Sequence, residues 1–545
     1  NKETEKENVV KNIMRLPCLA GDLYTTNGES LDWNSNAFLY YTRSFNKQHN
    51  LNVSAGWEAA SGTTESTNAH YRGFPSGEFH SLNYAAEVYK KPTRTENTTR
   101  RVSVLASANY TWNDIYLVDA SVRFDGSSEF GANQKWAPFF SGGLGVNIHN
   151  YDFFKSNGYI NKLKLRASYG RTGKVNFPAY AATTMYETLF DEWYITGYGA
   201  VLKALGNKDL TWEKTDKLSV GIETKTFHDR LTVDFEYYYN KTIDLVNDVT
   251  LSQTSGFSTY KDNMGQVANK GVELKLRADI YRDRNWNVAL WGNMAHNKNE
   301  ILKISDSQKA YNERVAAYYK NEALYQETLG LSHGAEYSVP LPQYEEGASL
   351  TSIWAVRSLG IDPTTGKEIF LNRDGSIADK WNAAQEVVVG NTEPKCSGAF
   401  GLNLSYKNWT LFASFLYEWG GQEYNQTLVN NVENADLVNK NVDLRVLTDR
   451  WKKPGDIAQF KDIKDRGMTT LPTSRFVQDK ALVRLNSLNV SYDFNRDWIK
   501  KHLRMNLLRL EASTSDLINW SSIKQERGLS YPRSWKVEFS LKAQF

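Results

Sequence analysis

The C-terminal segment of the chain has the clearest hydrophobic pattern. From Arg533 to Phe545 apolar and polar residues alternate without a break. The apolar positions are Trp535, Val537, Phe539, Leu541, Ala543 and Phe545. Because successive side chains of a β-strand point to opposite faces, this pattern predicts a strand with one apolar and one polar face.

The same alternation recurs along the chain in pairs of predicted strands with short connections. Asn113-Asp114 separates two such strands and is a tight-hairpin signal. The predicted pairs are 32–45 with 51–60, 101–112 with 115–125, 136–148 with 162–170, 212–227 with 231–240, 270–281 with 286–299, 397–406 with 409–419, and 480–494 with 503–513. Long polar stretches separate several of the pairs, at about 61–99, 174–210, 302–390 and 425–475.

Short and long connections that alternate in this way are typical of outer-membrane barrels, which have short periplasmic turns and long outer loops. A soluble β-sandwich gives no reason to collect the long connections at one end. The sequence therefore predicts an all-β, transmembrane antiparallel β-barrel over 32–545, in which the four long stretches are extracellular loops. Residues 1–31 are polar and predict an irregular segment, also an extracellular loop.

The number of strands adds a second expectation. The pattern gives about fifteen strands, whereas bacterial barrels close with an even number. We therefore expect this chain to be the C-terminal part of a larger barrel. No apolar signal-peptide core follows Asn1, so a leader was either removed or the natural chain begins elsewhere.

Composition excludes several other classes of protein. Aromatic residues make up 13% of the chain and mean hydropathy is −0.56. No stretch approaches the roughly 18 apolar residues of a membrane helix. The 65 basic and 62 acidic residues form no basic patch that would predict nucleic-acid binding. The two cysteines, Cys18 and Cys396, build no disulfide framework.

Seven segments resemble the SusC/RagA family of TonB-dependent outer-membrane transporters of Bacteroidota. Each is short, but they follow the order of the family along almost the whole chain, from about 32 to 545. They are Val122-Arg-Phe-Asp-Gly-Ser-Ser-Glu-Phe130, Leu165-Arg-Ala-Ser-Tyr-Gly-Arg-Thr-Gly173, Leu210-Thr-Trp-Glu-Lys-Thr215, Asn269-Lys-Gly-Val-Glu-Leu274, Leu359-Gly-Ile-Asp-Pro-Thr-Thr-Gly366, Trp451-Lys-Lys-Pro-Gly-Asp456 and Leu482-Val-Arg-Leu-Asn-Ser-Leu488.

The resemblance implies a barrel of about 22 strands with a plugged lumen. It also implies a SusD-like surface lipoprotein over the barrel mouth, and energy from the TonB complex acting through an N-terminal plug. This sequence contains neither that plug nor the N-terminal barrel portion. No cofactor is implied.

Motifs for catalysis and metal binding have weaker support than ordinary loop structure. Gly330-Leu-Ser-His-Gly334 fits a nucleophile-elbow pattern, but it lies in a polar loop without the required strand and helix. The eight histidines show no zinc-site spacing. The sequence therefore predicts neither a catalytic residue nor a metal ligand, and no enzyme.

Candidate substrate contacts are aromatic residues of the long loops. Such rings could stack on sugars or on peptide, although loop packing and partner contact explain them equally well. They are Trp193, Tyr194, Tyr198, Tyr337, Tyr344 and Trp354. On a predicted strand, Glu273, Lys275 and Arg277 oppose the apolar positions, as expected of a solvated channel wall or of a plug contact.

Two functions follow from this sequence. The first is the C-terminal barrel portion of a SusC-like importer for oligosaccharides or peptides, embedded in outer-membrane lipid and working with the SusD-like lipoprotein. The alternative is a SusC-like barrel that acts as a structural or assembly scaffold in an outer-membrane complex.

Overall fold

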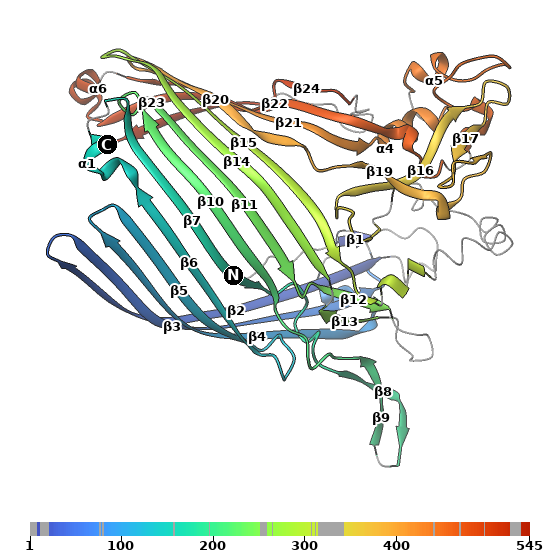
Figure 1. The fold of residues 1–545 in the computed structure, drawn as a ribbon. Coiled ribbons are helices and arrows are strands. Elements are labelled where there is room, and N and C mark those ends of the chain that lie inside the picture. Colours follow the sequence, from blue (N-terminus) through green and yellow to red (C-terminus); the bar gives the residue numbers. More distant parts are fainter. Residues whose placement is uncertain are drawn as a thin grey trace.

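A curved antiparallel sheet dominates the computed structural model of the chain (Figure 1). The structure describes residues 8–10, 21–75, 78, 81–155, 158–195, 197–250, 259–263, 265–306, 308–310, 312–313, 340, 343–439, 442–467, 470–494, 496–523 and 536–545. In these residues the main sheet has 17 strands, of which β1 (Asn8–Val10) and β24 (Asn519–Ser521) are only three residues long.

Fifteen longer strands form the wall of the described sheet, and each pairs antiparallel with the next along the chain. They are β2 (Asp22–Phe45), β3 (His49–Arg72), β4 (Glu87–Trp112), β5 (Tyr116–Ser127), β6 (Trp136–Asn147), β7 (Ile160–Lys174), β10 (Glu213–Thr226), β11 (Leu231–Ile243), β14 (Gln266–Arg282), β15 (Trp286–Lys303), β20 (Cys396–Tyr406), β21 (Trp409–Tyr424), β22 (Val477–Asp493), β23 (Leu507–Thr514) and β25 (Val537–Gln544). No pairing between described residues joins β2 to β25. The predicted all-β barrel-type sheet is confirmed.

The connections divide the sheet into two unlike ends (Figure 1). At one end, here the turn end, most connections are tight: Asn113 and Asp114 have φ of 52° and 56°, and Lys407 has φ of 49°. Positive φ at both central residues is the geometry of a type I′ hairpin turn. Two short helices, α1 (Asp152–Lys155) and α6 (Arg496–Leu503), also lie at the turn end. The long excursions all lie at the other end, here the loop end.

The strand register gives the sheet two different faces. Leu165, Ile222, Phe235, Leu274 and Met294 are direct partners across β7, β10, β11, β14 and β15. Because paired residues share a face, this row forms part of a continuous apolar face. The neighbouring row, Arg166, Gly221, Glu236 and Glu273, lies on the opposite, polar face.

The last strand keeps the register that its alternation predicts. Val537, Phe539 and Leu541 of β25 pair with Thr514, Ala512 and Leu510 of β23. They therefore continue the apolar face, while Glu538, Ser540 and Lys542 lie on the polar face. Residues 531–535, which include the first part of the predicted strand, lie outside the described residues.

Two predicted boundaries are wrong, because strands extend beyond their apolar cores. β2 begins at Asp22, within the segment predicted to be irregular, and pairs with β3 from Asp22 onward. The predicted loop 61–99 is mostly strand, since β3 continues to Arg72 and β4 begins at Glu87. Backbone pairing needs no apolar side chains, so the hydrophobic pattern marks only part of each strand.

The other long stretches are excursions from the sheet, as predicted, but they contain regular structure of their own. The stretch at 174–210 includes a projecting hairpin, β8 (Met185–Tyr194) and β9 (Gly197–Ala204). Another hairpin, β12 (Val246–Thr250) and β13 (Thr259–Asn263), lies between β11 and β14.

The largest excursion, 302–390, holds a separate four-stranded sheet. Its strands are β16 (Ser352–Ile361), β17 (Glu368–Leu371), β18 (Ile377–Ala378) and β19 (Glu386–Asn391). The stretch at 425–475 adds short helical turns, which include α4 (Gln426–Leu428) and α5 (Arg445–Thr448). We call β16–β19 together with the described residues of 425–476 the cap.

Candidate functional site

The polar face carries charged side chains that are matched across strands. Arg166 Nη2 on β7 donates to Asp234 Oδ1 at 3.0 Å and to Glu236 Oε2 at 2.6 Å, both on β11. The guanidinium therefore reaches across the intervening strand β10. Gly221 leaves it room, since an added Cβ there would lie 2.7 Å from Arg166 Nε.

A second matched cluster comes from the segment 122–130. Arg123 Nε donates to Asp125 Oδ1 at 2.5 Å, and Arg123 Nη2 donates to Glu58 Oε2 and to Ser103 Oγ, each at 2.9 Å. The cluster ties β3, β4 and β5 together on the polar face. Its charges are compensated, as expected of a wall that borders water or a polar filling.

Charged residues predicted to oppose the apolar positions of β14 do lie on the polar face. Glu273 pairs with Glu236 and Lys275 with Asp234 across the strand. Arg277 Nε lies 3.4 Å from Asp279 Oδ1. Their place on the polar face fits both a solvated channel wall and a contact with a plug.

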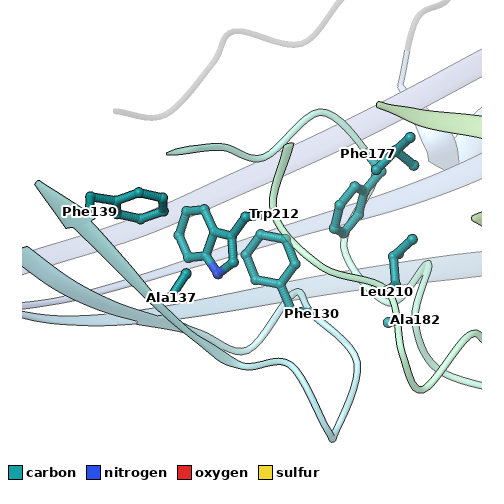
Figure 2. Packing of buried hydrophobic residues seen from close by; sticks show 8 residues of the cluster. Phe130, Ala137, Phe139, Phe177, Ala182, Leu210 and Trp212 are labelled. Carbon is teal, nitrogen blue, oxygen red and sulfur yellow. The ribbon is translucent and has the colours of Figure 1, made fainter. Parts of the chain in front are cut away.

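An aromatic cluster at the loop end anchors several excursions to the wall (Figure 2). Trp212 stacks on Phe130 with ring centroids 4.2 Å apart, and Phe139 and Phe177 complete the packing. Leu210 is fully buried beside them. Two of the short segments that carry the family resemblance, 122–130 and 210–215, thus meet in one core, which fixes where the loops leave the sheet.

A polar ladder lies on the wall near the loop end. Asn269 Oδ1 accepts from Asn297 Nδ2 at 3.2 Å and from Asn299 Nδ2 at 2.9 Å. The Tyr238 hydroxyl donates to Asn297 Oδ1 at 2.9 Å. At Gly271 an added Cβ would lie 2.6 Å from that hydroxyl, so the segment 269–274 needs glycine for close packing.

The cap has its own dry core, unlike the wall. Its buried apolar residues are Leu428, Val429, Val432, Ala435, Val446, Phe460 and Phe476. Arg475 lies at the edge of this core, 4.4 Å above the Phe476 ring, and bridges two carboxylates. Its Nη2 donates to Glu433 Oε1 at 2.7 Å and to Glu368 Oε2 at 2.9 Å.

This ion triad joins the two halves of the cap. Glu433 is fully buried, and Glu368 lies 107 residues before Arg475 in the chain. Burial alone would lower the pKa of Arg475, but attraction to Glu368 and Glu433 outweighs it and raises the pKa. The guanidinium therefore stays charged and holds β17 against the segment 425–476. Sequence reasoning missed these residues, because no local pattern connects positions so far apart.

A second contact between the two halves uses two of the segments that carry the resemblance. Trp451 Nε1 donates to the Pro363 carbonyl at 2.8 Å, and the Gly455 N–H donates to the same carbonyl oxygen at 2.8 Å. Gly366 has φ of 73°, and an added Cβ there would lie 2.6 Å from the Trp451 ring. Segments 359–366 and 451–456 therefore pack as one unit.

One cap carboxyl has an unusual proton affinity. Burial raises the pKa of Glu386 to about 7, although a hydrogen bond from the Gln343 side chain and attraction to Arg373 oppose the rise. Arg373 Nε also donates to the Glu386 carbonyl at 3.0 Å. Glu386 lies at the start of β19.

The structure does not bring the predicted substrate aromatics together. Trp193, Tyr194 and Tyr198 belong to the projecting β8–β9 hairpin, where Trp193 pairs with Tyr198 in the backbone ladder. Tyr344 lies beside the cap, its side chain exposed and its carbonyl bonded to Asn312 Nδ2 at 3.0 Å. Tyr337 lies outside the described residues.

The prediction for Trp354 needs correction. Its side chain is only 3% exposed and lies in β16, within the cap. A ring enclosed in this way has no face available for stacking on a substrate. The error arose because an aromatic residue in a long loop was expected to be exposed, whereas this loop folds into a sheet with its own interior.

Other chemistry finds little support in the part of the chain that the structure describes. No group of three or more His, Cys, Asp or Glu side chains there could hold a metal ion. Gly330-Leu-Ser-His-Gly334 lies outside the described residues. Among the described helices, none is long and apolar enough to cross a membrane.

Comparisons with known proteins identify the family to which the chain belongs. A family model described as TonB dependent receptor-like, beta-barrel matches residues 19–507. The chain is 26% identical to TonB-dependent receptor P39 of Formosa agariphila, covering 94% of this chain and 53% of that protein. It is 29% identical to TonB-dependent receptor SusC of Bacteroides thetaiotaomicron, over 44% of this chain and 25% of SusC.

A solved structure has the same fold as this chain. The chain superimposes on the structure of the RagAB peptide transporter with a TM-score of 0.80, over 96% of this chain and 56% of that one, at 22% sequence identity. The open-open state of RagAB gives a TM-score of 0.82. The chain spans about half the length of the curated relatives P39 and P3.

Proposed function

Because this chain belongs to the TonB-dependent receptor-like β-barrel family of the outer membrane, we propose that it forms the larger part of an importer wall for oligosaccharides or peptides. The resemblance to SusC/RagA transporters and the outer-membrane location, both predicted from the sequence, are confirmed by the family match and by the similarity to SusC and RagAB.

One observation carries this proposal: the middle parts of the wall strands separate an apolar face from a face with matched charges. Many large side chains of the apolar face, such as Phe124, Leu144, Leu290 and Phe539, are exposed in the chain by itself. Contact of such a surface with lipid costs no free energy, whereas its contact with water does. The charged face then lines the lumen, where Arg166, Glu236 and Arg123 meet water, substrate or plug.

The wall requires completion to serve as a barrel. β2 and β25 have backbone groups without a partner in the described sheet, and such groups are expensive in hydrocarbon. Antiparallel closure between the outer edges of fifteen strands needs an odd number of further strands, and a barrel of the family size needs about seven. We propose that these strands, and a plug that engages the TonB complex, belong to a part of the protein outside this sequence.

The cap has the properties expected of a docking surface for a SusD-like lipoprotein. Several of its apolar side chains point into solvent: Val438 is 82% exposed, Leu444 70%, Leu447 63% and Ile457 96%. Exposed apolar side chains gathered in one segment mark contact sites for partners. The names of the relatives describe receptors and a transporter, so we favour import over the scaffold role.

Substrate contacts remain a proposal for the exposed aromatic residues alone. One of them is Tyr344, which lies beside the cap with an exposed side chain. The β8–β9 hairpin, which carries Trp193, Tyr194 and Tyr198, projects away from the wall (Figure 1) and suits contact with a partner at least as well. RagAB is described as a peptide transporter, so peptide is the first substrate class to test.

The test uses cells that express the complete outer-membrane protein containing this chain. We expect the wild type to restore uptake of labelled oligopeptides or oligosaccharides to a deletion strain. A variant with Val438→Glu, Leu444→Glu and Leu447→Glu should lose the co-purifying lipoprotein and most of the uptake, while it inserts normally into the outer membrane.

The matched control is Ile377→Glu, which places a carboxylate at another exposed apolar position of the cap. It should leave partner recovery and uptake unchanged. If the wild type takes up neither oligopeptides nor oligosaccharides, the import proposal is refuted. Full uptake without lipoprotein recovery in the triple variant would refute only the docking proposal.

A further inference from the structure

Helix α6 at the turn end combines basic and apolar side chains on a short exposed element (Figure 1). Its last turn contains Lys500, Lys501 and His502, and Arg504 follows directly. Ile499 is fully buried and attaches the helix to the protein. Trp498 is 51% exposed and stacks on His502 with ring centroids 5.2 Å apart.

The apolar face of the wall leads directly to this helix. At the turn end, Trp409 packs against Tyr492 at 4.8 Å, and Tyr492 packs edge-on against Phe494 at 5.1 Å. Tyr492 shares the apolar face with Trp409 through the β21–β22 register. Phe494 is two residues before α6. Aromatic side chains at this position are typical of the boundary between hydrocarbon and head groups, so α6 lies at that boundary.

A second connection at the turn end supports the same position at the boundary between hydrocarbon and head groups. α1 carries Phe153, which is exposed and packs at a tilt against Tyr151 with ring centroids 5.4 Å apart. Tyr151 in turn hydrogen-bonds to Tyr116 of the wall at 2.7 Å. An exposed phenylalanine beside tyrosine hydroxyls suits an interface that is apolar on one side and wet on the other.

The charge around α6 is positive. Asp497 lies in its first turn, and Asp493 is bound by Arg509 through two hydrogen bonds at 2.6 and 2.8 Å. Lys500, Lys501 and Arg504 are all exposed. A basic helix with an exposed tryptophan at the edge of a lipid-covered wall matches the phosphate groups of anionic phospholipids.

We propose that α6 and Arg504 form a binding surface for anionic phospholipid head groups in the membrane leaflet at the turn end. The lysines would contact the lipid phosphates while Trp498 lies at the head-group boundary. This interaction would fix the depth of the wall in the membrane at the β22–β23 connection. It is separate from transport, and it does not depend on what the lumen carries.

Native mass spectrometry of the complete outer-membrane protein tests the proposal. The protein is released from nanodiscs of phosphatidylethanolamine and phosphatidylglycerol in equal amounts, and the retained lipids are identified. We expect the wild type to retain phosphatidylglycerol preferentially. Each basic residue near an anionic surface contributes about fivefold to binding, so the variant Lys500→Gln/Lys501→Gln should lose about 25-fold of that preference.

The control is Lys452→Gln/Lys453→Gln, an adjacent pair of exposed lysines in the cap, at the loop end. It removes the same charge and should keep the lipid preference. Heat-modifiable migration on a gel establishes that each variant is folded. High salt should weaken the wild-type preference, because the contact is exposed.

Three results would overturn the proposal: no preference in the wild type, equal preference in the wild type and the α6 variant, or equal loss in the α6 variant and the control. Capture of a periplasmic protein through Lys500 and Lys501, with lipid retention unchanged, would assign the surface to a protein partner instead.

Discussion

The wall and the cap belong to the same chain but are stabilised in different ways. Wall strands have an apolar face that only lipid can cover, and their polar face carries matched charges such as Arg166 with Asp234 and Glu236. The cap instead encloses a core of its own, with Val429, Val432 and Phe476 fully buried. The stability of the wall therefore depends on the lipid around it, whereas the stability of the cap depends on contacts between distant parts of the chain.

This difference predicts that each region can be damaged without the other. A change at a buried position of the cap should release the cap from an intact wall. A change on the apolar face of the wall should destabilise membrane insertion and leave the cap core as it is. The predictions below use that independence.

Loss of the Arg475 guanidinium should have the largest effect. Arg475→Leu leaves the buried Glu433 without its ion-pair partner, and breaking a buried ion pair from one side costs about 3–5 kcal/mol. Backbone hydrogen exchange should accelerate across 425–476 and remain unchanged in β10 and β11. Arg475→Lys, which keeps the charge, should show a smaller change.

Equal acceleration of exchange in the cap and in β10–β11 of the Arg475→Leu variant would contradict the independence of the two regions. So would unchanged exchange in both, because the buried carboxylate would then have found another partner.

A charge on the apolar face of the wall should lower the free energy of unfolding by nearly as much as the loss of Arg475. Ala167 and Ser168 are neighbours on β7 and point to opposite faces, since Ala167 pairs with Val220 and Ser168 with Ser219. Ala167→Arg should lower the free energy of unfolding in lipid by about 2–4 kcal/mol, whereas Ser168→Arg should lower it by less than about 1 kcal/mol. Urea titration of the complete protein in vesicles measures both. Equal costs would show that the faces are wrongly assigned.

The smallest effect concerns pH and is confined to the cap. The pKa of Glu386 is raised from 4.5 to about 7 in the fold. Its stabilising contribution is therefore complete below pH 4.5 and is lost as the pH rises through about 7. We expect cap stability to fall by about 2 kcal/mol over this window, because the carboxyl keeps some contact with solvent.

Hydrogen exchange of β16–β19 as a function of pH measures this change. Glu386→Gln should remove the dependence. Asp374→Asn should not alter it, because hydrogen bonds from Ser376 lower the pKa of that exposed carboxyl. A slope that persists in Glu386→Gln would assign the titration to another group.

The wall could be predicted from the sequence because its information is local. Alternation with period two located the apolar core of most strands, and Asn113-Asp114 located a turn. The same signal failed where a strand leaves the hydrocarbon: the first ten residues of β2 and the start of β4 are mostly polar and do not alternate, and only their pairing with β3 makes them strands.

The cap could not be predicted in this way. Glu368 and Arg475 meet across 107 residues, and Trp451 meets Pro363 across 88, so neither contact leaves a local pattern. The exposure of loop aromatics could not be judged either, as Trp354 demonstrates. The family resemblance identified segments 359–366 and 451–456, but their contact with each other became visible only in the fold.

The most direct test of the account is the orientation of the last strand. The central claim is that the apolar face of the sheet lies against lipid and the charged face lines the lumen. Nitroxide spin labels at positions 539 and 542 of the complete protein in vesicles report which face each side chain occupies. We predict that the label at 539 is accessible to oxygen dissolved in lipid and that the label at 542 is accessible to a water-soluble nickel complex. The reverse pattern would contradict the claim.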